Sequence, residues 1–476
     1  MQPTRRHLIL ALPVLFALAP APVAHAQTDD GHLRVMLHSA YSGEIHGDVP
    51  QHDKYIGAGS CSAVACHGGI QPRSITKYGE VLQNEYSTWI TADKHAQAYS
   101  SLKLPLGVQI AETLKLGKPE KAQRCLVCHA VSVPASEQLR AFDISDGVSC
   151  ESCHGPASEW LGPHVQAGMT HETLVKTYHL FDNNDLVQRS EKCLTCHIGA
   201  PGLSVDHELI AAGHPDLRFE LDSFTAVEPP HWVEKGADGL PKNDPIFGMR
   251  AWAIGQAVQL QVSMKRVARN AGDRSRPWPE FSEMDCITCH HSLTGQLSWR
   301  QQGLEKMATD KGAFAQHRVG DPPYNLSRYV LFRHFADEVD HGTNAELNAE
   351  ALKVSALITS MSSDRAAVEV AANRAAELAH KLSEELQNYT YDRARTERLL
   401  RSITADADTI SQQGERTAEQ AAMTVDSLYI ADAKAGATNA ETRKAIDALF
   451  KQVDNPSAYN APMFAAQMKR VHDSLR

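Results

Sequence analysis

Every cysteine in this sequence belongs to a pair that is followed at once by a histidine. Four pairs have two residues between the cysteines, and they run from Cys125 to His129, Cys150 to His154, Cys193 to His197 and Cys286 to His290. In the remaining pair, four residues lie between Cys61 and Cys66, and His67 follows. Cysteines three positions apart lie on one side of a helical turn, so both can reach one edge of a flat group. The C-x-x-C-H spacing therefore predicts c-type haem attachment.

The chemistry of attachment accounts for each residue of the pattern. The two thiols add to the two vinyl groups of a haem, and the next residue supplies the proximal imidazole to the iron. We therefore expect five covalently bound haem c groups. The cofactor-binding residues are Cys61, Cys66, Cys125, Cys128, Cys150, Cys153, Cys193, Cys196, Cys286 and Cys289, and the proximal metal ligands are His67, His129, His154, His197 and His290. The wider spacing makes Cys61 to His67 the loosest match.

Two other interpretations use the same cysteines. Zinc binds cysteine pairs, and exported proteins often form disulfides. Zinc requires four ligands per site and does not explain a histidine after every second cysteine. A disulfide framework requires no histidine. The pattern favours haem over both.

A second ligand for each iron must come from the other histidines, because the sequence has 24 in all. The candidates have small or rigid neighbours that allow a flat ring to approach. His95 precedes Ala96 in an expected helix from Asn84 to Leu102. For each candidate the alternative is a surface histidine, and methionine ligation is less supported. The candidates are His95, His164, His214, His231, His207 and His291, with one of His38, His46 and His52 as a further possibility.

The first 26 residues have the features of a secretory signal peptide. Arg5 and Arg6 precede an apolar stretch from Leu8 to Pro20, and Ala24-His25-Ala26 forms a cleavage pattern. A membrane helix is the alternative, but the stretch is shorter than about 18 residues. We expect cleavage near Ala26, a periplasmic or otherwise exported protein, and no transmembrane segment in the mature chain.

Composition limits the remaining possibilities. The formal net charge is −10 and the sequence has no long basic run, so nucleic acid is not an expected partner. Aromatic residues make up only 6% of the chain, which is little for the core of a protein of this size. We expect a mainly α fold in which short helices and loops wrap round stacked haems that fill the interior.

The haem pairs end near residue 300, and a different composition follows. Residues 344–454 are rich in Ala, Glu and Leu, with apolar positions three, four or seven apart. This spacing is typical of amphipathic helices, interrupted near Ser362-Ser363-Asp364. We expect a C-terminal helical bundle without haem that packs on the haem domain, or else an oligomerisation surface. The expected organisation is 1–26 signal peptide, 27–300 pentahaem domain, 301–343 linker and 344–476 bundle.

Several segments resemble the cytochrome c-552/c-554 superfamily, across residues 55 to about 300. The segment from Asp146 to Pro156, which includes Gly147-Val148-Ser149-Cys150, is the most similar. The other matching segments are Gly57 to Gly68, Trp89 to Ala96, Ala212 to Glu220 and Met284 to His291. The resemblance implies that His95 and His164 are distal ligands and that haem planes pair in parallel and perpendicular contacts.

The sequence also departs from the superfamily. Five haem motifs are present where cytochrome c-554 of ammonia oxidisers has four. The lysine-ligated haem of related nitrite and tetrathionate reductases has no counterpart, and no tyrosine is identified as the cross-link of hydroxylamine oxidoreductase. We therefore expect electron transfer between redox donor and acceptor proteins. One alternative is a multihaem oxidoreductase in which one open-faced haem acts on a small nitrogen or sulfur compound. The other is a structural conduit for electrons, in which the C-terminal bundle joins chains into a homo-oligomer.

Overall fold

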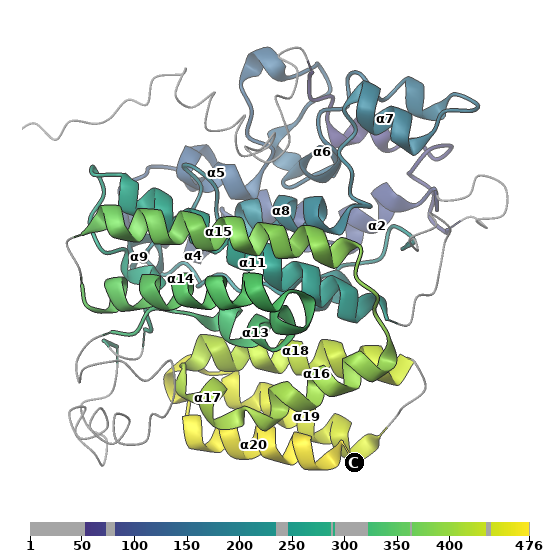
Figure 1. The fold of residues 1–476 in the computed structure, drawn as a ribbon. Helices are drawn as coiled ribbons and strands as arrows, with labels where there is room; N and C mark the ends of the chain where they lie inside the picture. The colour runs from purple at the N-terminus through teal and green to yellow at the C-terminus, as the bar shows by residue number, and fades with distance from the viewer. Residues whose placement is uncertain are drawn as a thin grey trace, which may run out of the picture.

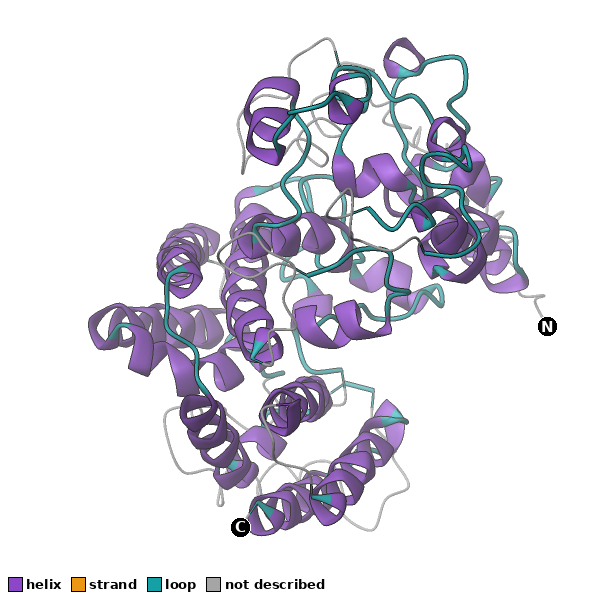
Figure 2. Cartoon of the chain, turned by 90° about the vertical axis from the view of Figure 1, so that its right-hand side faces the viewer, coloured by secondary structure: helices purple, strands orange, loops and turns teal. Residues whose placement is uncertain are grey.

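The computed structural model describes residues 53–72, 81–234, 246–286, 289–290, 322–361, 364–434 and 439–475. In this part of the chain the secondary structure is helical, with three isolated β-bridges and no sheet (Figure 2). The prediction of a mainly α fold, with short helices followed by a helical region, is confirmed. The helices are α2 Glu85–Ala92, α3 Ala98–Ser101, α4 Pro105–Thr113, α5 Gln123–His129, α6 Cys150–His154, α7 His171–Tyr178, α8 Leu186–His197, α9 His207–Ala211, α10 Leu221–Val227, α11 Phe247–Gly272, α13 Ser327–Val339, α14 His341–Thr359, α15 Arg365–Gln387, α16 Arg393–Ala405, α17 Ala407–Gln412, α18 Glu415–Lys434, α19 Ala440–Val453 and α20 Ala461–Ser474.

The cysteine pairs lie among short helices joined by loops (Figure 1). The expected single helix from Asn84 to Leu102 is instead two helices, α2 and α3, separated by a 3₁₀ turn over Lys94–Gln97. The cause is Asp93, whose backbone is extended and whose carboxylate accepts a hydrogen bond from the backbone N–H of His95 at 2.8 Å. This carboxylate caps a new turn and so ends the preceding helix.

The long helix α11 connects the two halves of the molecule. It is buried on all sides, with 20 of its 26 residues inaccessible, as expected for a helix at the centre of a large core. Helix α15 packs along it, and the facing side of α15 is lined by small residues that allow the backbones to approach closely: Ala371, Ala372, Ala375, Ala376 and Ala379. Gly255 is needed on α11 because a Cβ there would lie 2.7 Å from the Cβ of Leu221.

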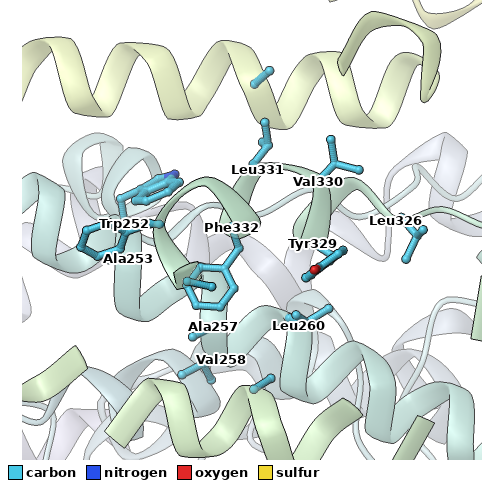
Figure 3. Packing of buried hydrophobic residues seen from close by; sticks show 14 of the residues in the cluster. Trp252, Ala253, Ala257, Val258, Leu260, Leu326, Tyr329, Val330, Leu331 and Phe332 are labelled. Atoms are coloured by element: carbon cyan, nitrogen blue, oxygen red, sulfur yellow. The ribbon is translucent and has the colours of Figure 1, made fainter. Parts of the chain in front are cut away.

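The core that contains α11 is continuous from Leu186 in α8 to Val471 in α20. Figure 3 shows Trp252 and Leu260 of α11 beside Tyr329 and Phe332 of α13. Phe332 is completely buried. The C-terminal helices therefore pack on the haem-motif region, as one of the two interpretations of the bundle expects.

The segment 301–343 was expected to be a linker, and its described part does not fit that expectation. Residues 327–339 form α13, which is central to the shared core. The prediction failed because this helix is apolar on several faces, so it lacks the amphipathic spacing that identified the later helices.

The other C-terminal helices follow the sequence pattern closely. The break near Ser362-Ser363-Asp364 is confirmed, because Asp364 precedes α15 and its carboxylate accepts from the backbone N–H of Ala367 at 3.0 Å. Helix α20 was not anticipated; Asn460 caps its first turn through the N–H of Met463. Within the described residues, every helix is too short or too polar to cross a membrane.

Candidate functional site

The spacing of each standard cysteine pair is set by a helical turn that ends at the histidine. Helices α5, α6 and α8 terminate at His129, His154 and His197 respectively. At the last pair, the backbone N–H groups of Cys289 and His290 both donate to the carbonyl of Cys286, at 3.2 and 2.8 Å. Four pairs thus present two thiols and an imidazole from one turn. All ten cysteines are among the described residues, and none forms a disulfide.

The pair with the wider spacing also has a defined geometry. Cys61 ends a 3₁₀ helix over Ala58–Cys61, and the backbone N–H of Cys66 donates to Ala63 at 2.8 Å. His67 is fixed by the carboxylate of Glu85, which lies 2.9 Å from its Nδ1. The two extra residues are accommodated in a turn, and the imidazole still follows the second thiol.

Four of the proximal histidines face a second histidine from a distant part of the chain. The ring centres are 6.3 Å apart for His67 and His164, 6.4 Å for His129 and His214, 6.5 Å for His95 and His197, and 6.2 Å for His207 and His290. Each of these partners was a candidate distal ligand. The structure therefore brings together residues separated by as many as about 100 positions in the sequence.

These separations fit an iron between the rings. A metal–imidazole bond is about 2 Å long and the ring centre lies about 1 Å beyond the nitrogen, so two imidazoles on opposite sides of one metal have centres about 6 Å apart. Direct contact between rings would allow shorter distances. The residues present thus fit a haem iron with a histidine on each face, together with two thiols per site for covalent attachment.

The Nδ1 atoms of these histidines are held by acceptors that leave Nε2 available. Carbonyl oxygens lie 2.9 Å from Nδ1 of His129, at Ala98, and 2.8 Å from Nδ1 of His214, at Pro215. The Asp93 carboxylate lies 3.1 Å from Nδ1 of His95. His164 and His231 make similar contacts with the carbonyls of Leu161 and Pro229. Such partners fix the tautomer and orientation of a metal-ligating imidazole.

Two histidines outside this set differ in this respect, whereas His179, His341 and His472 also contact their partners through Nδ1. His171 uses Nε2 to contact Asp182 at 2.9 Å, and His334 uses both ring nitrogens, with Ser402 and Asp406. Neither has an Nε2 free to bind iron. His291, His38, His46 and His52 lie outside the described residues.

The fifth site is less complete. His154 is buried, and burial lowers its pKa to about 4, with a smaller contribution from nearby His231. No ring contact joins these two histidines in the described structure. His231 instead forms a cluster with Asp93 and Glu228, whose ligand atoms all lie within 4.8 Å of one another. His154 and His197, whose pKa burial also lowers to about 4, are both neutral at pH 7, the form that binds metals.

Contacts between cysteines of different pairs show which haem-attachment sites are neighbours. The thiols of Cys61 and Cys150 are in hydrogen-bonding contact, and so are those of Cys128 and Cys196. Cys153 interacts with Cys193 electrostatically. The sites therefore follow the order first, third, fourth, second rather than their order in the sequence. Each site lies beside the next, so haems attached at these cysteines would be neighbours.

Glu151 holds the first and third sites together. Its carboxylate is buried and accepts hydrogen bonds from the backbone N–H groups of Ile56, Gly57 and Ala157 at 2.8 to 3.1 Å. Since Glu151 lies inside the third motif and Ile56 precedes the first, this one side chain sets their relative position. This role of Glu151 could not be predicted from the sequence, because haem attachment does not restrict the residues between the two cysteines of a motif.

A helical chain with paired imidazoles and thiols at one turn defines a c-type cytochrome with several haem sites. Residues 61–155 match the family described as cytochrome c554 and c-prime. Residues 61–155 are thus similar to a cytochrome c554 domain, and this similarity implies a c-type haem cofactor. Cytochrome c-554 of Nitrosomonas europaea is 28% identical over 123 residues, covering 23% of this chain and 50% of that protein. The chain spans about half the length of this curated relative. No solved structure matches.

Proposed function

We propose that this protein is an exported pentahaem c-type cytochrome that transfers electrons between redox partner proteins. The observation that carries the proposal is the set of four imidazole pairs with ring centres 6.2 to 6.5 Å apart. An iron with a nitrogen ligand on each face has no open position for a substrate. When bound, haem supplies an iron that cycles between Fe(III) and Fe(II). Similarity to cytochrome c-554 over 123 residues, 23% of this chain, supports the same role.

The proposed ligand sets follow the ring pairs. His164 serves the site at His67, His214 the site at His129, His95 the site at His197, and His207 the site at His290. His231 is assigned to His154 because of its electrostatic contact with it. This assignment uses every candidate in the described part of the chain; His291, His38, His46 and His52 lie outside it. Imidazole on both faces gives low reduction potentials relative to a methionine ligand.

The number of haems can be tested at the wider motif. We expect five haems per chain in the purified protein, measured as the pyridine haemochrome together with the intact mass. Replacing both Cys61 and Cys66 by serine should leave four, because the thiols that anchor the first haem are lost. The matched change at Cys286 and Cys289 should also leave four. Four haems in the unchanged protein, with free thiols at Cys61 and Cys66, would contradict the assignment of the first site.

The alternative function is that of a multihaem oxidoreductase acting on a small nitrogen or sulfur compound. A specific observation favours one place for it: the site at His154 has no ring contact with a second histidine in the described structure. In addition, the carboxylates of Asp93 and Glu228 lie close to His231. An open iron there would bind a small molecule, with two carboxyl groups close by.

Anoxic reoxidation separates the two functions. We expect the dithionite-reduced protein to be reoxidised slowly and without turnover by nitrite, hydroxylamine or tetrathionate. Its low-temperature EPR spectrum should contain only low-spin haems. Rapid catalytic reoxidation, together with a high-spin signal that the substrate abolishes, would contradict the carrier and support the oxidoreductase.

A further inference from the structure

A basic cavity lies between the haem-motif region and the C-terminal helices. It encloses about 520 Å³, including its mouth to solvent. His197 contributes to its wall, whereas Cys193 and Cys196 do not. Its charged side chains come from four separate segments: Asp216, Arg218, Arg266, Arg328, Arg416 and Glu419.

Three of the four arginines have carboxylate partners. Arg266 contacts Glu283 at 2.8 Å, Arg416 contacts Asp216 at 2.6 Å, and Arg218 contacts Glu419 at 2.6 Å. These pairs offset one another, so they leave no excess charge for an additional group. Arg328 of α13 is different. Within the described structure it forms no ion pair, and its Nε is buried without a hydrogen-bond partner.

An unpaired guanidinium in such a place is costly. Burial, with a smaller contribution from the neighbouring Arg266, lowers the pKa of Arg328 to about 10. A buried charge without a partner destabilises a protein, because its lost hydration is not compensated. The cavity thus has the composition of a site for an anion with a planar, two-oxygen face, which a guanidinium binds in bidentate geometry.

The position of the cavity identifies a source for this anion. Every haem carries two carboxylates on the edge opposite the vinyl groups that form thioethers. At the last site, Arg416 lies 3.6 Å from the sulfur of Cys286, so the cavity is near the thioether edge of that haem. At the fourth site, His197 lines the cavity and the two cysteines do not. The carboxylate edge of a haem attached there would therefore lie toward the cavity.

We propose that Arg328 binds a carboxylate of the haem attached at Cys193 and Cys196, so that a C-terminal helix completes a haem site. This inference rests on the haem attachment proposed above. A free oxyanion from solution could bind Arg328 in the same way, and the experiment below distinguishes it from the haem carboxylate. Among the described residues, Glu283 acts on this guanidinium electrostatically but forms its ion pair with Arg266.

The test compares Arg328→Gln with Arg333→Gln in the haem-loaded protein. Arg333 is on the same helix, but it contacts Asp406 on the side away from the cavity. The haem content of each variant is measured first, because a low content in the unchanged protein would count against haem attachment rather than against this inference. Midpoint potentials of the individual haems then follow from a redox titration monitored by EPR, with and without inorganic phosphate.

We expect Arg328→Gln to lower the midpoint potential of one haem, since loss of a cation beside its carboxylate favours Fe(III). Phosphate should not alter this shift, and Arg333→Gln should leave all potentials unchanged. Arg328→Lys, which keeps the charge, should restore most of the potential and controls for misfolding. A shift that appears only with phosphate would overturn the haem carboxylate in favour of a free oxyanion. Unchanged potentials in Arg328→Gln would overturn the site altogether.

Discussion

Replacing His95 by alanine should convert one low-spin haem into a high-spin haem. The ring of His95 faces that of His197 with centres 6.5 Å apart, and Asp93 holds its Nδ1 at 3.1 Å, so Nε2 is directed to the proposed iron. Without this imidazole, one face of the iron is open. Low-temperature EPR should show a new high-spin signal, and the reduced variant should bind carbon monoxide at one haem per chain.

His171→Ala is the matched control for this experiment. His171 is also partly exposed and also contacts a carboxylate, but through Nε2, to Asp182. Its removal should leave the spin states unchanged. If the spectrum of His95→Ala equals that of the unchanged protein, His95 is a surface residue that contacts Asp93, and the fourth site needs another ligand.

Phe332→Ala should destabilise the whole protein rather than the C-terminal region alone. Truncation of a fully buried phenylalanine typically costs about 3–5 kcal/mol, and Phe332 lies in the core that runs from α8 to α20. Because α8 carries the fourth motif, loss of this packing reaches the haem-motif region. We expect helix content, measured by far-ultraviolet circular dichroism, and haem absorbance to fall together at a lower temperature.

Met463→Ala provides the control, since Met463 is 57% exposed on α20. Exposed substitutions usually change stability by no more than about 0.5 kcal/mol. Two separate transitions in Phe332→Ala, with only the circular dichroism shifted, would show that the helices of the two regions unfold independently.

The sequence indicates the attachment residues because covalent chemistry restricts their spacing, and their assignment stays a prediction. Two thiols and one imidazole must meet one macrocycle, and only a few local sequences achieve this. The local frames of His95, His164 and His214 also indicated candidate ligands. Which histidine faces which motif could not be predicted, because the pairs depend on how distant segments pack. His207 and His290, for example, are 83 positions apart along the printed sequence and meet at 6.2 Å.

In the C-terminal helical region, individual helices were easier to predict than the contacts between them. Helices with one apolar face, such as α15, were predicted because their periodicity is visible in the sequence, and the start of α15 was indicated by its capping residue Asp364. Helix α13 was missed because a helix that is buried on several faces has no such periodicity. The ion pairs and cavity between α8, α11, α13 and α18 were likewise absent from the sequence patterns, since each involves residues from several segments.

The continuous core constrains the order of events during biosynthesis. The cysteine pairs precede α13 to α20 in the chain, so they are synthesised before the helices that cover α11. Until α15 is present, the side of α11 that faces Ala372 and Ala375 has no cover, and exposed apolar surface of this kind promotes aggregation. We therefore expect a protein shortened before α13 to aggregate although it retains all ten cysteines.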